Sequence, residues 1–186
     1  QYILAMFNLH HRINRILIKL SYHLGVSKLF SMPKMLALDS TNLCDLKCPL
    51  CPTGLRDKTV ERGSIKLEQF KAIVNRLGKY LQSINLYSWG EPLLHKSLVD
   101  MIQHTAINHK IRTITSVHLG NLSDEQVEGI ATSGLDKLIV SVDGATQKVY
   151  EKYRVGGDIE KVFANMKRLV EAKKRHNSNV NIIWNF

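Results

Sequence analysis

Cysteine is scarce in this sequence and is confined to one short segment. The 186-residue chain contains three cysteines, Cys44, Cys48 and Cys51. Disulfide-stabilised proteins usually carry an even number of cysteines spread along the chain, so the sequence does not indicate a secreted disulfide framework. Three clustered cysteines fit a reducing compartment, and we expect a cytoplasmic location.

Long apolar runs are also missing. No stretch of about 18 apolar residues occurs, which argues against a transmembrane helix. The first residues lack the compact apolar region and the small-residue cleavage site of a signal peptide. The chain begins at Gln1 and stops at Phe186 within an apolar run, so we expect it to be part of a longer protein.

Acidic residues are absent from the first 34 positions. This segment carries five basic residues and thus half of the net charge of +10: Arg12, Arg15, Lys19, Lys28 and Lys34. The remaining positive charge is spread over the rest of the chain. A general nucleic-acid-binding surface is therefore not indicated, and we expect no nucleic-acid partner.

The same segment has the pattern of a basic amphipathic helix that ends near Gly25. Its apolar residues recur at helical spacing: Ile3, Leu4, Phe7, Ile13, Ile16, Leu17, Leu20 and Leu24. Two roles remain open for this helix. It packs on the rest of the protein, or residues 1–30 make a peripheral contact with an anionic membrane or an acidic partner. We treat 1–34 as helix and linker, and 35–186 as a separate domain.

Strand and helix patterns alternate through residues 35–186. Strands are predicted at 35–39, 83–88, 112–117, 138–142 and 180–186, and helices at 66–81, 97–109, 123–133 and 158–174. Ser123 and Gln126 form a predicted capping box. The alternation predicts an α/β fold with a parallel sheet. A flat doubly wound sheet also fits, but we favour an incomplete (β/α) barrel of four βα units and the start of a fifth strand.

The barrel is favoured because the candidate site residues follow predicted strands, and barrel enzymes place their functional groups at the carboxyl ends of strands. The cysteines follow the first predicted strand. Trp89, Gly90, Glu91 and Pro92 follow the second, Ser116 and His118 end the third, and Ser141 and Asp143 end the fourth. A glycine such as Gly90 allows close approach of the backbone to a ligand. We expect these segments to converge on one face.

The cysteine spacing is suited to a metal centre. Three thiolates on a cubane iron–sulfur cluster leave one iron without a protein ligand. Zinc bound by the cysteines with His95 or His118 is an alternative, although no second Cys/His doublet is present. The cysteines can also be small buried residues, or a disulfide with a spare thiol.

The C-x3-C-x2-C pattern of Cys44, Cys48 and Cys51 resembles the radical S-adenosylmethionine (SAM) superfamily. The segments 48–54, 89–94 and 134–157 resemble those of SPASM-type members. The resemblance implies a 4Fe–4S cluster on the three cysteines, with SAM on its open iron. Trp89 replaces the first glycine of the family segment, and Leu50 replaces an aromatic residue common in relatives.

The resemblance also implies contacts to SAM. Residues 89–92 would contact its amino group, Ser141 and Asp143 its ribose or methionine part, and Arg154 its carboxylate. Ser116 and His118 would face the cofactor or the substrate. SAM would be cleaved reductively to methionine and a 5′-deoxyadenosyl radical, which takes hydrogen from a substrate.

The resemblance makes a peptide or protein our first expectation for the substrate. RNA, a sugar or another small metabolite is the alternative within the same chemistry. Outside it, the chain would be a non-enzymatic iron–sulfur electron-transfer module. Flavodoxin or ferredoxin is the expected electron donor.

Overall fold

The structure is a computed structural model that describes the backbone of residues 2–186 and the side chains from residue 9 onward. Ile3, Leu4 and Phe7 of the predicted apolar stripe therefore lie outside the described side chains. The first element is the long helix α1 (Tyr2–Leu24), which a linker joins to the remainder of the chain. None of the helices in this part of the chain is long and apolar enough to cross a bilayer.

A five-stranded parallel sheet forms the centre of the fold. Its strands are β1 (Met35–Ala37), β2 (Ser83–Asn85), β3 (Arg112–Val117), β4 (Lys137–Ser141) and β5 (Asn181–Asn185). Their spatial order is the order of the sequence, and every neighbouring pair is parallel. The open sheet is that of a partial barrel, which confirms the predicted fold class.

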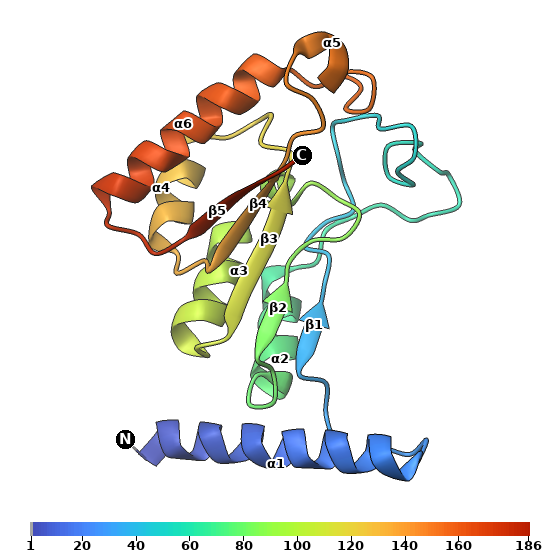
Figure 1. The fold of residues 1–186 in the computed structure, drawn as a ribbon, viewed down its shortest axis with the longest axis vertical. Helices are drawn as coiled ribbons and strands as arrows, with labels where there is room; N and C mark the ends of the chain where they lie inside the picture. The colour runs from blue at the N-terminus through green and yellow to red at the C-terminus, as the bar shows by residue number, and fades with distance from the viewer. Residues whose placement is uncertain (1) are drawn as a thin grey trace.

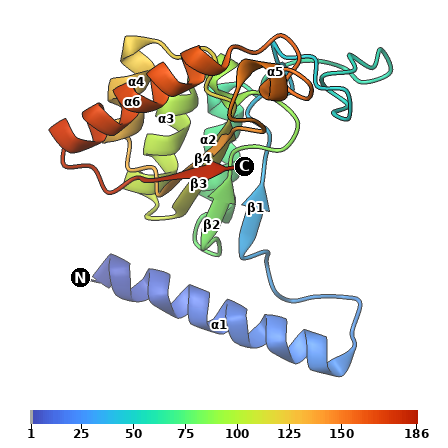
Figure 2. The same cartoon turned by 45° about the horizontal axis from the view of Figure 1, so that its top comes forward.

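Helices connect the strands and cover one face of the sheet (Figures 1 and 2). They are α2 (Leu67–Leu77), α3 (Leu98–Gln103), α4 (Asp124–Thr132) and α6 (Ile159–Arg175). The predicted capping box of α4 is present, with Ser123 and Gln126 in reciprocal contact. The Asp158 side chain caps α6 by accepting from two backbone N–H groups.

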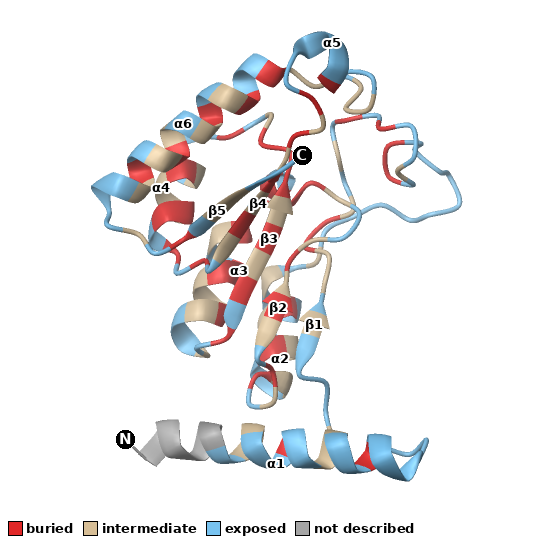
Figure 3. Cartoon of the chain, in the orientation of Figure 1, coloured by how far each residue is buried: buried red, intermediate tan, exposed pale blue. Residues whose placement is uncertain are grey.

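The core lies between the sheet and these helices (Figure 3). Burial alternates along β3 and β4, as the two-residue period of a strand requires. Leu138 and Val140 point to the helices and are fully buried, whereas Ser116 and Ser141 lie on the other face and are partly exposed. The two serines therefore reach the inner side of the partial barrel.

Several elements are shorter than predicted. β1 and β2 end at Ala37 and Asn85. The last hydrogen bond between them runs from the Leu38 N–H to the Asn85 carbonyl (2.9 Å), and both segments then turn into the loops of the site. The helix predicted at 97–109 changes to a π-helix, η2 (His104–Asn108). Thr105 donates its hydroxyl to the carbonyls of Met101 (3.1 Å) and Ile102 (2.9 Å) at this point, which perturbs the regular helix.

Two short helices were not predicted. The 3-10 turn η1 (Pro92–Leu94) follows β2, and α5 (Gln147–Tyr150) follows β4. The Thr146 side chain caps α5, and the last residue of this helix, Tyr150, is fully buried. The two turns thus lie in the segments that follow the carboxyl ends of β2 and β4.

Asn165 on α6 ties this helix to the loop after β3. Its amide donates to the carbonyl of Leu119 (2.9 Å), a buried residue whose φ of 61° lies in the left-handed region. Alanine leaves that carbonyl without its donor, so we expect Asn165→Ala to lower the free energy of unfolding by about 1–3 kcal/mol. Chemical denaturation of the full-length protein measures this change.

The matched control is Asn179→Ala, at an exposed loop position. It should alter the free energy of unfolding by less than about 0.5 kcal/mol. Equal losses from the two substitutions would show that the link to Leu119 contributes nothing specific.

Candidate functional site

One cavity at the carboxyl ends of the strands contains all three cysteines. Its volume is about 290 Å³. Cys44, Cys48 and Cys51 are free thiols in this structure, and Cys48 is buried while the other two are partly exposed. Burial raises the pKa of the Cys48 thiol, and the nearby Arg154 guanidinium opposes that shift. Three sulfur donors on one cavity suit a thiophilic metal centre.

Backbone contacts shape the cysteine loop. The Lys47 N–H donates to the Val155 carbonyl (2.9 Å), and the Cys51 N–H donates to the Cys48 carbonyl (3.2 Å). A Cβ on Gly54 would lie 2.5 Å from the Cys48 carbonyl oxygen, closer than real side chains come. Gly54 is therefore required by the loop itself, a role that the sequence did not reveal.

Gly90 brings the loop after β2 against the cysteine loop. A Cβ at this residue would lie 1.8 Å from the Thr41 carbonyl oxygen, so the contact admits only glycine. From the sequence we expected Gly90 to allow a ligand to approach, but the position of its missing side chain faces the Thr41 backbone. The neighbouring Glu91 N–H donates to the Leu43 carbonyl (2.8 Å) and strengthens the same junction.

The Glu91 side chain links η1 to the end of β3, and the residue is only 3% exposed. One carboxylate oxygen accepts from the Leu93 N–H (3.2 Å), and the other accepts from the His118 N–H (2.8 Å). Burial raises the pKa of Glu91, and the charge of His118 and the two backbone donors oppose that shift. With its own N–H on Leu43, Glu91 connects the cysteine loop, η1 and the end of β3.

His118 contacts a residue that the sequence analysis missed. Its Nε2 lies 2.8 Å from Oδ1 of Asp45, next to Cys44 in the chain, and the Gly120 N–H donates to its Nδ1 (3.0 Å). Asn121 donates to the other Asp45 oxygen (2.6 Å). The hydrogen bond from His118 lowers the pKa of Asp45, although partial burial opposes this. A lone aspartate in a loop carries no spacing signal that would have identified it.

Both histidines of the zinc alternative have their two ring nitrogens hydrogen-bonded in this structure, but only His118 lines the cavity. His95 uses its ring nitrogens for the Ile65 carbonyl (2.8 Å) and the Ser97 N–H (3.0 Å), and it is not among the residues that line the cysteine cavity. The ligand atoms of Cys44, Asp45 and His118 lie within 4.8 Å of one another. This geometry does not extend to Cys48 and Cys51.

Ser116, Ser141 and Arg154 complete the cavity wall from the β3 and β4 side. The serine hydroxyls lie 3.3 Å apart. Arg154 pairs through Nε with the Asp143 carboxylate, and its guanidinium lies 5.4 Å from the ring centre of Tyr153. Tyr153 also lines the cavity and was not singled out from the sequence.

The structure thus brings most of the predicted site residues together. Ten of them line the cavity: Cys44, Cys48, Cys51, Trp89, Gly90, Glu91, Ser116, His118, Ser141 and Arg154. Asp143 and Pro92 are not part of its wall. Asp143 is turned toward Arg154, and Pro92 is buried at the start of η1.

The Gly90 contact predicts that a larger residue at this position lowers both stability and cluster loading. In Gly90→Ala the added methyl displaces Thr41 and with it the cysteine loop. We expect a loss of about 1–3 kcal/mol in the free energy of unfolding and less iron bound per chain after anaerobic reconstitution. Gly63→Ala is the control, because nothing lies within 4 Å of a Cβ there. Full iron loading of the Gly90 variant would show that the junction does not shape the site.

Comparison with known proteins identifies the family. The model of the radical SAM superfamily matches residues 38–185. PqqA peptide cyclase of Rhodopseudomonas palustris is 31% identical over 136 residues, which cover 72% of this chain and 34% of that protein. A probable GTP 3′,8-cyclase of Methanocaldococcus jannaschii is 27% identical, with coverages of 74% and 46%. The chain therefore spans a third to under half of these relatives.

Solved structures show the same fold. SuiB of Streptococcus suis, bound to S-adenosylmethionine, superposes with a TM-score of 0.67 at 17% identity, over 90% of this chain and 36–37% of that chain. SuiB has also been solved with its precursor peptide SuiA. The family match covers most of the described chain and includes the cysteine loop. This protein belongs to the radical SAM superfamily.

Proposed function

We propose that the protein is a radical SAM enzyme that modifies a peptide. A 4Fe–4S cluster and SAM are the cofactors of its family. The observation that supports the proposal is the single cavity lined by three free cysteines together with the segments that follow β2, β3 and β4. Because the chain spans a minor part of its relatives, the activity is proposed for the whole protein.

The residues present fit these cofactors. Cys44, Cys48 and Cys51 would hold the cluster, and three thiolates leave one of four irons for SAM. The bound cofactors supply a one-electron cleavage to methionine and a 5′-deoxyadenosyl radical, which takes a hydrogen atom from the substrate. A one-electron donor such as flavodoxin or ferredoxin must supply the electron.

The protein's own side chains would position the methionine part of SAM. Arg154 pairs with Asp143 through Nε, so its terminal N–H groups lie on the other edge of the guanidinium, where they could bind the SAM carboxylate. Asp143 would then orient Arg154 instead of contacting ribose. Ser116 and Ser141 present hydroxyls to the same cavity and can each donate or accept.

The mouth of the cavity favours a peptide. Leu50 is 80% exposed and Trp89 is 53% exposed, and both line the cavity together with Tyr153. Apolar and aromatic side chains at a mouth offer contact area for the side chains of a peptide. The relatives named for peptides, PqqA peptide cyclase and SuiB, support the same substrate class.

Reductive cleavage of SAM tests the reaction. The reduced, cluster-loaded, full-length protein should convert SAM to methionine and 5′-deoxyadenosine, and Cys48→Ala should abolish this. Arg154→Gln should weaken SAM binding by about 1.5–3 kcal/mol, the value of a hydrogen bond to a charged group. Arg175→Gln, which removes an exposed pair with Glu128, is the control and should leave SAM binding unchanged. A loaded, reducible cluster that never cleaves SAM would favour the electron-transfer module.

Deuterium transfer tests the substrate class. Hydrogen abstraction from a deuterated substrate moves deuterium into 5′-deoxyadenosine, which mass spectrometry detects. We expect transfer from a library of deuterated peptides and none from deuterated GTP. Transfer from GTP alone would contradict the peptide assignment and favour a nucleotide, in line with the relatives named as GTP cyclases.

A further inference from the structure

Helix α1 lies at the end of the molecule opposite the cysteine loop, beyond the amino ends of β1 and β2 (Figures 1 and 2). A narrow face centred on polar side chains connects it to the remainder of the chain, with Leu17 and Ile18 half-buried on either side of them. The Asn14 side chain donates to the Met32 carbonyl (2.9 Å) and accepts from the Met32 N–H (2.8 Å). Asn14 and Ser21 are buried, and the His10 ring meets the Tyr80 ring edge-on. These contacts set the rotation of α1.

That rotation turns the apolar stripe of the helix outward. Five apolar side chains, spaced three or four residues apart and thus on one face, are 49–63% exposed: Leu9, Ile13, Ile16, Leu20 and Leu24. Apolar exposure continues in the linker at Leu29 (58%) and Phe30 (83%). An amphipathic helix normally buries this stripe in its own domain. From residue 9 onward the exposed members of the stripe therefore do not pack on the domain, and only Leu17 of the predicted stripe is half-buried.

A row of basic side chains flanks the stripe. At 100° per residue, Arg12, Arg15 and Lys19 lie beside the stripe on the side away from Asn14 and Ser21, and all three are exposed. No acidic residue occurs among the first 34 positions. Two copies of the chain paired through this face would bring two rows of like charge into one interface. The charge instead complements an anionic surface.

We propose that α1 binds in the plane of an anionic lipid surface. Its apolar stripe enters the boundary between headgroups and acyl chains, and Arg12, Arg15 and Lys19 pair with lipid phosphates. The helix lies on the surface because it is not apolar enough to cross a bilayer. In this orientation the cysteine cavity, at the opposite end of the strands, opens away from the lipid. Substrate and electron donor then reach the cavity from the aqueous side.

Vesicle sedimentation tests this proposal with the full-length, cluster-loaded protein. The probes are vesicles of phosphatidylcholine with phosphatidylglycerol, and vesicles of phosphatidylcholine alone. The protein should sediment with the anionic vesicles and much less with the neutral ones. Each basic side chain near an anionic surface contributes about fivefold to binding, so Arg12→Gln/Arg15→Gln/Lys19→Gln should weaken it on the order of a hundredfold.

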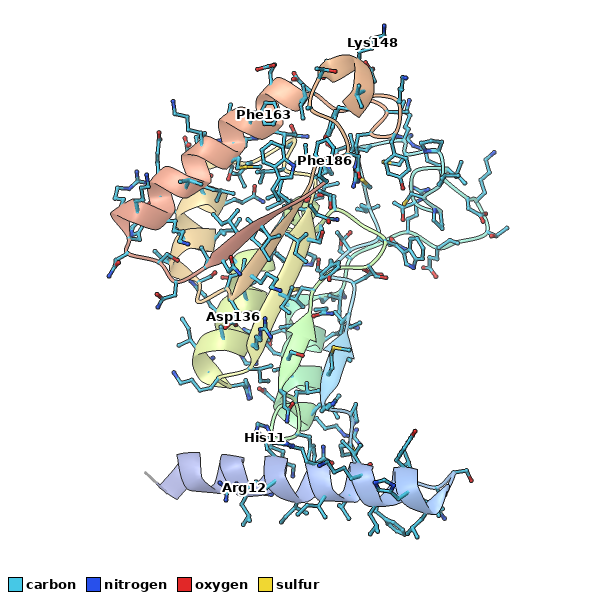
Figure 4. All side chains as sticks on the ribbon, in the orientation of Figure 1. His11, Arg12, Asp136, Lys148, Phe163 and Phe186 are labelled. Carbon is cyan, nitrogen blue, oxygen red and sulfur yellow. The ribbon has the colours of Figure 1, made fainter. Side chains whose placement is uncertain are left out.

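The charge-matched control is Lys148→Gln/Lys167→Gln/Lys174→Gln, which removes three exposed basic residues from α5 and α6. Figure 4 places Lys148 at the opposite end of the molecule from Arg12. This variant should bind the anionic vesicles as the natural protein does. Equal weakening of both variants would show that binding follows net charge and not α1, which would overturn the proposal.

A single substitution provides an independent readout if the triple variant does not fold. In Ile16→Trp, at a position 63% exposed, added tryptophan emission should shift to the blue on anionic vesicles and be quenched by brominated acyl chains. Unchanged emission would overturn the proposal. A dimer detected by light scattering and dissociated by Ile16→Gln would also overturn the proposal, because the apolar stripe would then bind a second copy of the chain.

Discussion

The site depends on the close contact between the backbone at Gly90 and the backbone at Thr41. Three cysteines in a flexible loop cannot present their thiols in one arrangement unless other segments hold that loop. Gly90 allows the loop after β2 to meet it without a side chain between them. Glu91 then extends the junction to Leu43 and to the start of the loop after β3. A buried carboxylate that accepts two backbone N–H groups is costly to disturb, which makes the junction rigid.

The sequence was sufficient where the signals are local. Strand and helix alternation, the Ser123 capping box and the cysteine spacing each depend on residues close together in the chain, and the first two of these appear as predicted. The family and the partial barrel are confirmed. Side-chain contacts between separate segments could not be predicted from the sequence, because no local pattern reveals that Asp45 contacts His118 or that Arg154 pairs with Asp143. Gly90 illustrates the limit, since the sequence marked the residue but not what it touches. The SAM contacts assigned from the resemblance, and the division at residue 34, stay predictions.

The molecule has two ends with opposite character. The carboxyl ends of the strands carry the cysteines, two hydroxyls and a guanidinium around one cavity. The other end carries a helix whose contact face is centred on the polar Asn14 and Ser21 and whose free face is apolar and basic. Asn14 joins α1 to Met32 in the linker, and this contact also determines which face of the helix is free. The proposed lipid contact and the proposed chemistry therefore do not compete for one surface.

Electron paramagnetic resonance tests the central claim, that three cysteines hold a cluster with one iron open to SAM. The spectrum of the reduced, cluster-loaded, full-length protein is recorded before and after SAM is added. The account predicts that SAM changes the spectrum, since an iron without a protein ligand is available to bind it. A spectrum that SAM leaves unchanged, from a fully loaded cluster, would mean that the protein occupies all four irons and would contradict the account.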